Sequence, residues 1–138
     1  MIRKYITALA LCLVQYAMLY GQYWEQVTNI PAPYSGTHYL DVFFLPDGQN
    51  GWMCGFNGHV IRTTNGGATW LGTQVPGGNH LESIDFPSLF TGYTSGVEGI
   101  WKSTNGGATW ANITPADSVN YWGCYFVNDN VGLVIGEG

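Results

Sequence analysis

Positive charge is the scarcest feature of this sequence of 138 residues, which has 4 lysine and arginine residues against 9 acidic residues. A protein that binds nucleic acid has to neutralise several phosphates with cations, and this chain has no cluster of them. The same shortage disfavours binding to anionic membrane surfaces. We therefore expect neither nucleic acid nor an anionic membrane among its partners.

Long apolar runs are also scarce, and the one that exists lies near the N-terminus at residues 5–20. It carries no charge and follows Arg3 and Lys4, which is the layout of a secretory signal peptide. The run is shorter than the ~20 residues needed to span a bilayer. We predict that residues 1–21 are a signal peptide cleaved after Gly21. The protein is then secreted or extracytoplasmic, without a stable membrane span in the mature chain.

Cysteine is the third scarce residue, with three in the chain. Cys12 lies in the predicted signal peptide and is the residue that a lipoprotein would modify, although Leu11 stands where a small residue belongs. Cys54 and Cys124 match no metal-binding or redox motif in their spacing. We expect two small buried apolar side chains. A disulfide between them is the alternative, which an oxidising compartment permits.

Glycine, by contrast, is abundant, with 20 residues, and it marks an internal repeat. The octapeptide TTNGGATW begins at Thr63, and STNGGATW begins at Ser103. Longer segments that begin at Leu40, Leu81 and Tyr121 align with a period of 40 to 41 residues. Within them the glycines coincide in threes: Gly51, Gly92 and Gly132, then Gly55, Gly96 and Gly136. A period of this length is typical of repeat architectures such as β-propellers.

Each repeat also has the pattern of short β-strands, with runs of aromatic and β-branched residues separated by Gly, Asn, Asp or Pro. The first strand of each repeat is predicted at 40–45, 81–86 and 121–127, and the second strand at 51–55, 92–96 and 132–136. The third strand is predicted at 59–64 and 99–104, and the fourth strand at 69–75 and 109–114. Four antiparallel strands in about 40 residues are the signature of a β-propeller blade. The sequence therefore predicts an all-β fold made of such blades.

The octapeptide falls where the chain turns back from the third strand to the fourth. We expect Asn65 and Asn105 to bond their own backbone two residues on, and the glycine pairs that follow accept positive φ. Trp70 and Trp110 then enter the outer strand, where burial of an indole of ~150–250 Å² is worth several kcal/mol. We interpret the octapeptide as a structural motif that positions a buried tryptophan.

The two octapeptides resemble the Asp-box, S-x-D-x-G-x-T-W, with Asn in place of Asp. The matching residues are Thr63, Asn65, Gly67, Thr69 and Trp70 in the first copy and Ser103, Asn105, Gly107, Thr109 and Trp110 in the second. Asp-boxes occur in sialidases, xyloglucan-degrading glycosidases, sortilin-type receptors and photosystem II stability/assembly factor-like propellers, and the spacing here is most similar to the last group. The resemblance implies a BNR-repeat β-propeller with the boxes on its rim, away from the ligand face.

Residues 22–138 are then predicted to form a partial propeller of about two and a half blades plus an N-terminal outer strand. The outer strand is placed at 23–30, because YWEQVTNI resembles the segments that follow the octapeptides. The blades are placed at 39–75, 80–114 and 120–138, the last of them incomplete. Propellers close with at least four blades, so we expect the sequence to be part of a longer protein.

The resemblance leaves a xyloglucanase- or sialidase-like glycoside hydrolase fragment open as the alternative function. A sialidase holds its substrate carboxylate with several arginines. Removal of residues 1–21 leaves Arg62 and Lys102 against nine acids, a formal net charge of −7, and we interpret both cations as solvated charges at strand ends. Asp41 and Glu82 occupy equivalent inner-strand positions and could form a glycosidase acid pair, but partly hydrated acids at a channel mouth are the simpler interpretation. We assign no catalytic residue.

Ligand contacts in propellers usually come from the loops that join second to third strands and fourth to first strands. The candidates there are Tyr34, His38, Asn57, His59, Asn79, His80, Glu98, Asp117 and Glu137. The histidines lack the spacing of a metal site, so we expect neither a metal nor a cofactor. The sequence predicts a secreted, non-enzymatic β-propeller module that binds protein or glycan through this loop face, or that serves as a structural domain of a larger surface protein.

Overall fold

The computed structural model describes residues 26–97, 99–116 and 119–137 of the chain. The predicted signal peptide, Cys12 and the candidates Glu98 and Asp117 lie outside these residues. Within the described ranges, ten β-strands and one short 3-10 helix, η1 (Tyr34–Gly36), are joined by turns. No helix in this part of the chain is long and apolar enough to cross a membrane.

The strands form three antiparallel sheets, in which each strand pairs with the next one along the chain. The first sheet contains β1 (Tyr39–Phe44), β2 (Gly51–Gly55), β3 (His59–Thr63) and β4 (Leu71–Gln74). The second contains β5 (Leu81–Asp85), β6 (Gly92–Gly96), β7 (Gly99–Ser103) and β8 (Ala111–Asn112). The third is the hairpin of β9 (Tyr121–Asn128) and β10 (Val131–Gly136). A four-stranded meander of this kind is the unit of a β-propeller.

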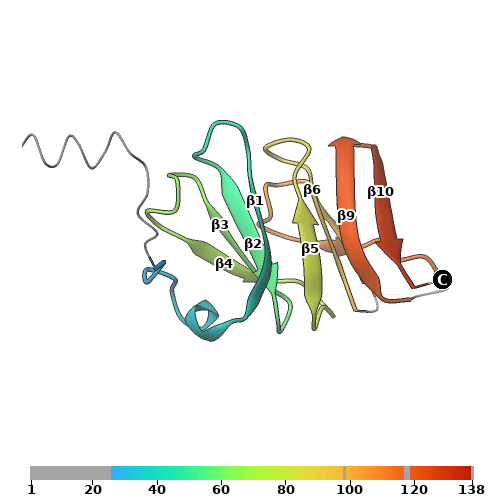
Figure 1. Ribbon diagram of the computed structural model, residues 1–138, viewed down its shortest axis with the longest axis horizontal. Coiled ribbons are helices and arrows are strands. Elements are labelled where there is room, and N and C mark those ends of the chain that lie inside the picture. Colours follow the sequence, from blue (N-terminus) through green and yellow to red (C-terminus); the bar gives the residue numbers. More distant parts are fainter. Residues whose placement is uncertain (1–25, 98, 117–118, 138) are drawn as a thin grey trace, which may run out of the picture.

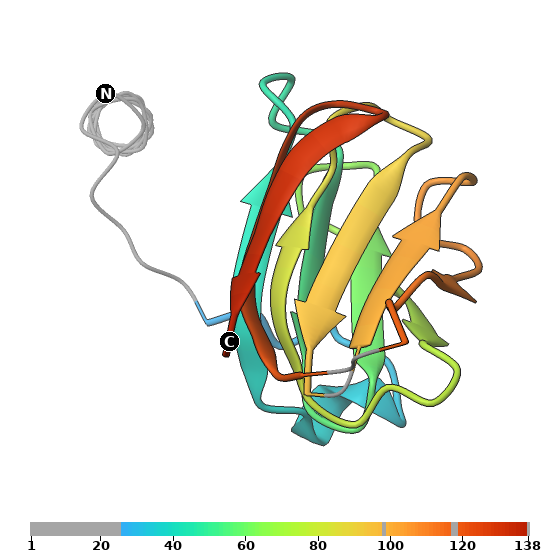
Figure 2. The same ribbon diagram turned by 90° about the vertical axis from the view of Figure 1, so that its right-hand side faces the viewer.

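The three sheets stand side by side along the long axis of the molecule (Figure 1). β5 packs on β1 and β2 of the first sheet, and β9 packs on β5 and β6 of the second. Viewed from the right-hand end of the stack, the β9–β10 hairpin is the nearest layer (Figure 2). Successive four-stranded sheets packed in this way are propeller blades, so the predicted all-β fold class is confirmed.

Each strand overlaps its predicted segment, and β2 and β6 have the predicted bounds. The fourth strands, β4 and β8, are shorter than the predicted 69–75 and 109–114. One reason is that the N–H groups of Thr69 and Thr109 donate to the side chains of Asn65 and Asn105, at 2.9 Å in each turn. These N–H groups are therefore used within the turn, and each strand begins two residues later than predicted.

Residues 26–30 of the predicted N-terminal outer strand at 23–30 form no strand in the described chain, and the rest of that segment lies outside the described residues. A strand requires backbone hydrogen bonds to a neighbouring strand, whereas a side chain holds this segment. Asn29 Nδ2 donates to the carbonyl oxygens of Gly67 at 3.0 Å and Ala68 at 2.6 Å. The segment is thus tied to the first octapeptide turn without extending a sheet.

The hydrophobic core lies between the first and second sheets. Nine buried side chains form it: Trp52, Cys54, Val60, Val75, Leu81, Ile84, Phe86, Trp101 and Trp110. Trp52 stacks on Phe86 with 3.7 Å between ring centroids, and Trp110 meets the same ring edge-on at 5.9 Å. Because all nine residues come from two different blades, burial of their apolar area joins the blades into one packed unit.

Three of the repeated glycines allow a close approach of two backbones at the ends of β2, β6 and β10. A Cβ at Gly55, Gly96 or Gly136 would lie between 1.8 and 2.2 Å from a backbone oxygen of the chain entering the inner strand. The carbonyls concerned belong to His38, His80 and Asn120, and each accepts the N–H of the residue after the glycine. Any larger residue would break this contact, which explains why these glycines coincide in all three repeats.

Candidate functional site

The octapeptide turns have identical internal hydrogen bonds. In the second turn, Ser103 Oγ accepts the N–H groups of Asn105 at 3.3 Å and Gly107 at 2.9 Å, and it donates to Asn105 Oδ1 at 3.0 Å. Asn105 Oδ1 also accepts the N–H of Thr109, and Nδ2 donates to Thr109 Oγ1 at 2.8 Å. The same five bonds in the first turn are made by Thr63, Asn65, Gly67 and Thr69. These polar side chains are therefore engaged with one another and with the turn backbone.

The predicted bond from each asparagine side chain to the backbone two residues on is wrong. The N–H two residues on, of Gly67 or Gly107, donates to the hydroxyl of Thr63 or Ser103, while Asn65 and Asn105 accept the N–H four residues on. Both hydroxyl residues are buried at the end of a third strand. A buried hydroxyl needs a hydrogen-bond partner, and the turn supplies one.

The tryptophans that end the octapeptides are buried through apolar packing and not through a hydrogen bond of the indole. Trp70 is 5% exposed and Trp110 is 6% exposed, and neither indole Nε1 has a hydrogen-bond partner in the described structure. Trp110 belongs to the core between the first two sheets. Trp70 lies outside that core and packs edge-on against Phe44 at 6.4 Å. Of the two, Trp110 is therefore the one that belongs to the core between the first two blades.

The two cations in the described part of the chain, Arg62 and Lys102, are bound, so their interpretation as solvated strand-end charges is wrong. Arg62 Nη1 donates to the carbonyl oxygen of Gly106 at 3.2 Å. Lys102 Nζ donates to the carbonyl oxygen of Asp129 at 3.3 Å. Each cation reaches from the third strand of its own blade to the blade that follows, so both stabilise contacts between blades.

Asp41 is likewise engaged between two blades. Its Oδ2 accepts hydrogen bonds from Ser83 Oγ at 3.0 Å and from the N–H of Ile84 at 2.9 Å, and its Oδ1 accepts the N–H of Val42 at 2.8 Å. Both carboxylate oxygens therefore hold backbone and side-chain groups of the inner strands. This arrangement gives no support to Asp41 and Glu82 as the acid pair of a glycosidase.

Cys54 and Cys124 are both free thiols, so the alternative of a disulfide between them is not realised. Cys54 is fully buried in the core, as expected of a small apolar side chain, and Cys124 is half-buried. Burial raises the pKa of the Cys124 thiol to about 11 and raises the pKa of Cys54 well above its usual value. A thiol held in its protonated form is a poor nucleophile.

Several candidate ligand residues lie where the chain enters β1 and β5, at the ends of these strands opposite the octapeptide turns; η1 lies at the bottom of Figure 1. His38, Phe56 and His80 form a row of rings, with centroids 5.4 Å apart for the first pair and 3.8 Å for the second. We call this row the ring cluster. His38 is exposed, and Phe56 and His80 are half-buried. The cluster therefore offers a partly hydrated aromatic surface.

A second pair of rings stands beside the β2–β3 turn. Tyr34 of η1 meets His59 edge-on at 4.8 Å, and Thr37 Oγ1 lies 2.5 Å from His59 Nδ1. Burial lowers the pKa of His59, so the neutral imidazole is favoured. Asn57, at φ 60°, forms the tip of the turn with its side chain exposed. Tyr34, Asn57 and His59 are thus presented on one side of the first blade.

The remaining sequence candidates lie elsewhere or serve the backbone. The carbonyl of Asn79 accepts the N–H of Gly58 at 3.2 Å, which fixes the β2–β3 turn. Glu137 directly follows β10, and its Oε2 accepts Asn120 Nδ2 at 3.1 Å. No group of three His, Cys, Asp or Glu side chains that could hold a metal occurs among the residues the structure describes.

Sequence reasoning missed Phe56, the residue that joins the two imidazoles of the ring cluster. An isolated β-bridge pairs Phe56 with His80, and the N–H of Phe56 donates to the carbonyl of His38 at 3.1 Å. The repeat gave no signal, because the equivalent positions hold Val97 and Glu137. The available signal was local: an aromatic residue directly before the Asn-Gly pair of a tight turn.

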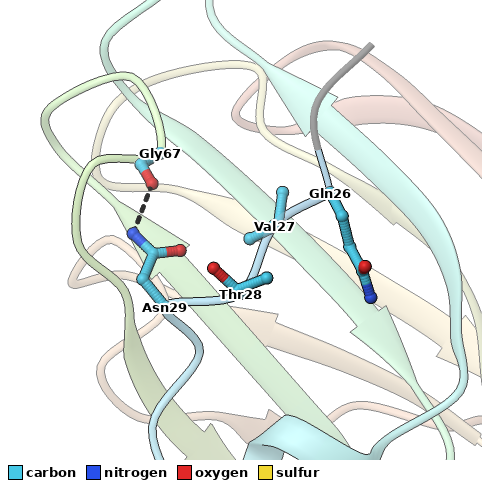
Figure 3. A pocket seen from close by; sticks show the side chains of 5 residues that line it. All are labelled: Gln26, Val27, Thr28, Asn29 and Gly67. Atoms are coloured by element: carbon cyan, nitrogen blue, oxygen red, sulfur yellow. Dashed lines mark hydrogen bonds between the residues drawn. The ribbon is translucent and has the colours of Figure 1, made fainter.

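A polar hollow lies at the opposite end of the first blade, beside the first octapeptide turn (Figure 3). Its lining residues are Gln26, Val27, Thr28, Asn29 and Gly67. The side chain of Asn29 points to the carbonyl of Gly67 (Figure 3). The hollow is therefore built by the N-terminal segment crossing the turn, and none of the sequence candidates for ligand binding lines it.

Stacked four-stranded antiparallel blades define the class of protein to which this fold belongs, the β-propellers. Among solved structures, "YCF48 bound to D1 peptide" has a similar fold, with a TM-score of 0.62 and 23% sequence identity. The match covers 72% of this chain and 34% of that chain, so the present chain spans about a third of its neighbour. No protein-family model and no curated protein matches the sequence.

Proposed function

We propose that this chain is a non-enzymatic binding module that holds a peptide segment of a partner protein against the ring cluster. The observation that carries the proposal is the row of His38, Phe56 and His80, which lies where the first blade meets the second, with His38 exposed and the other two rings half-buried. Flat rings with a polar edge give contact area with little loss of conformational entropy, which suits the recognition of extended peptides. The similarity to a propeller with a bound peptide supports this choice.

The test uses a displayed library of random peptides selected against the full chain. We expect the selected peptides to lose about tenfold or more in affinity for His38→Ala and Phe56→Ala. Phe90→Ala is the matched control, because Phe90 is also exposed but lies in the β5–β6 turn. Equal binding by all variants would contradict the proposal. If the chain instead bound oligosaccharides on an array, and His38→Ala abolished that binding, the ligand would be a glycan and not a peptide.

We also propose that the protein acts outside the cytoplasm, in the cell envelope or beyond it. The support is the order of residues at the N-terminus, where two cations precede an uncharged apolar run. In a bacterial host, mass spectrometry of the exported chain should then find Gln22 at its N-terminus. An uncleaved chain that stays in the cytoplasm would refute this assignment.

A further inference from the structure

The inner strand of each described sheet carries a β-bulge at the same position. The extra residue, which has no partner in the register with the second strand, is Leu40 in β1, Glu82 in β5 and Trp122 in β9. A β-bulge redirects the side chain of the extra residue, and bulges are frequent beside functional sites. We call these three residues the bulge row.

The bulge row is continuous because the three inner strands lie side by side (Figure 1). Asp41 Oδ2 accepts the N–H of Ile84 at 2.9 Å, and Ser83 Oγ accepts the N–H of Cys124 at 3.3 Å. Asp41 and Ser83 directly follow the extra residues of β1 and β5, so both contacts join neighbouring strands in the same register. The three extra residues therefore stand at the same level on adjacent strands.

The side chains of the bulge row reach solvent. Leu40 is 43% exposed and Trp122 is 48% exposed, whereas Glu82 is half-buried. Glu82 is the residue with a described blade on either side, since β5 packs on β1 and on β9. The position therefore stays accessible when both of its neighbours are in place, and its exposure does not depend on an edge of the stack.

The bulge row adjoins the ring cluster. His38 precedes Leu40 by two residues, and His80 precedes Glu82 by two residues. Two residues of a strand span about 7 Å, which is the length of two residues of an extended peptide. A peptide segment held on the ring cluster therefore has the bulge row within reach of its neighbouring side chains.

The charge of the row calls for a cation from outside the chain. Arg62 and Lys102 are the two cations in the described ranges, and both bind backbone carbonyl oxygens of the following blade. Lys102 Nζ also lies 5.1 Å from the centroid of the Tyr93 ring. Neither cation is therefore available to neutralise Glu82, and the whole chain has an excess of acidic residues.

We propose that the bulge row binds a lysine or arginine side chain of the partner peptide. The Glu82 carboxylate is the counter-ion, and the Trp122 indole is the surface on which the cationic side chain lies. The face of an indole attracts a cation, and the apolar stem of lysine or arginine packs on an apolar surface, which Trp122 and Leu40 supply. This inference rests on the proposed function, because it names the chemistry of the peptide that the ring cluster holds.

The first test compares peptides selected from a displayed random library against the full chain and against Glu82→Gln. We expect the peptides selected on the wild type to be enriched in lysine and arginine, and those selected on Glu82→Gln to lack this enrichment. Asp47→Asn is the matched control, because it removes the same charge beyond the far end of β1. Peptides selected on the control should be as basic as those selected on the wild type. Circular dichroism verifies that the variants fold.

A double-mutant cycle with one selected peptide then assigns the contact. Because Glu82 is half-buried and partly screened by water, we expect Glu82→Gln to lower the affinity by about three- to fivefold. Replacement of the basic residue of the peptide by glutamine should cost about as much, and the two changes together should cost little more than one. Trp122→Ala should weaken binding by about tenfold and Trp122→Phe by less. A rise in NaCl from about 0.05 M to about 0.5 M should weaken wild-type binding more than Glu82→Gln binding.

The outcomes separate this inference from the proposed function. Peptides without basic residues whose binding is lost in His38→Ala would overturn the inference and leave the proposed function standing. Basic peptides that couple to Glu82 but bind His38→Ala and Phe56→Ala like the wild type would support the basic-residue site and contradict the ring cluster. Independent losses for Glu82→Gln and the altered peptide would also overturn the inference. A library that yields no binding peptide would overturn both.

Discussion

At the scale of single residues, the hydroxyl and amide side chains of the octapeptide bind one another and the turn backbone. Asn105 connects three groups: it accepts from Ser103 Oγ and from the N–H of Thr109, and it donates to Thr109 Oγ1. An aspartate would keep both accepted bonds, and the Thr109 hydroxyl can rotate to donate to it. This explains how Asn can stand where the resembling motif has Asp.

Replacement of Asn105 should therefore depend on the new side chain. We expect Asn105→Ala to lower the free energy of unfolding by about 1–2 kcal/mol, because the N–H of Thr109 loses its partner. Asn105→Asp should stay within about 0.5 kcal/mol of the wild type. Urea denaturation measures both, with Thr104→Ala at the exposed neighbouring position as the control. Equal losses for the two variants would contradict the bonding scheme.

The thiols provide a prediction about pH. Burial raises the pKa of Cys124 to about 11, so at pH 8 about one thiol in a thousand is ionised. Iodoacetamide should alkylate the folded chain slowly and the chain in guanidinium rapidly, as peptide mass spectrometry would show. Since the folded pKa is raised, the stability from the protonated thiol is complete below the unfolded value and is lost as pH rises through about 11. Rapid alkylation of Cys124 in the folded chain at pH 8 would contradict this.

At the scale of strands and turns, a strand ends where a side chain, in place of the neighbouring strand, binds a backbone N–H group. β8 ends at Asn112, and the N–H of Ile100 on β7 binds Thr114 Oγ1 at 2.9 Å in place of a further ladder bond. The sequence pattern located this strand but could not show that a side chain would replace the ladder. The same holds at residues 26–30, where Asn29 binds a turn and no strand forms.

The glycine at the end of each second strand can be tested directly. A Cβ at Gly96 would lie 1.8 Å from the carbonyl oxygen of His80, so we expect Gly96→Ala to cost about 3 kcal/mol through displacement of the two backbones. Gly36→Ala is the control, because no atom lies within 4 Å of its Cβ position. Thermal melts would compare them, and a Gly96→Ala chain as stable as the control would refute the close approach.

At the scale of the whole molecule, the core shared by the first two blades makes them one cooperative unit. Trp110 is 6% exposed and meets Phe86 at that core. We expect Trp110→Ala to lower the free energy of unfolding by about 3–5 kcal/mol, measured in urea by circular dichroism. Phe90→Ala, at an exposed position, should have little effect. A loss below about 1 kcal/mol for Trp110→Ala would show that the indole does not stabilise the core.

The sequence by itself determined the local structure within each blade. Strand positions, the turn between third and fourth strands, and the repeated glycines all depend on residues close together in the chain, and the repeat displays them more than once. Only the tertiary structure decided what joins one blade to the next. Arg62 binds Gly106, Asp41 binds Ile84, and the ring cluster unites His38 with His80, all through contacts about forty residues apart. Local periodicity carries no information about such contacts, because they are fixed by how the sheets stack.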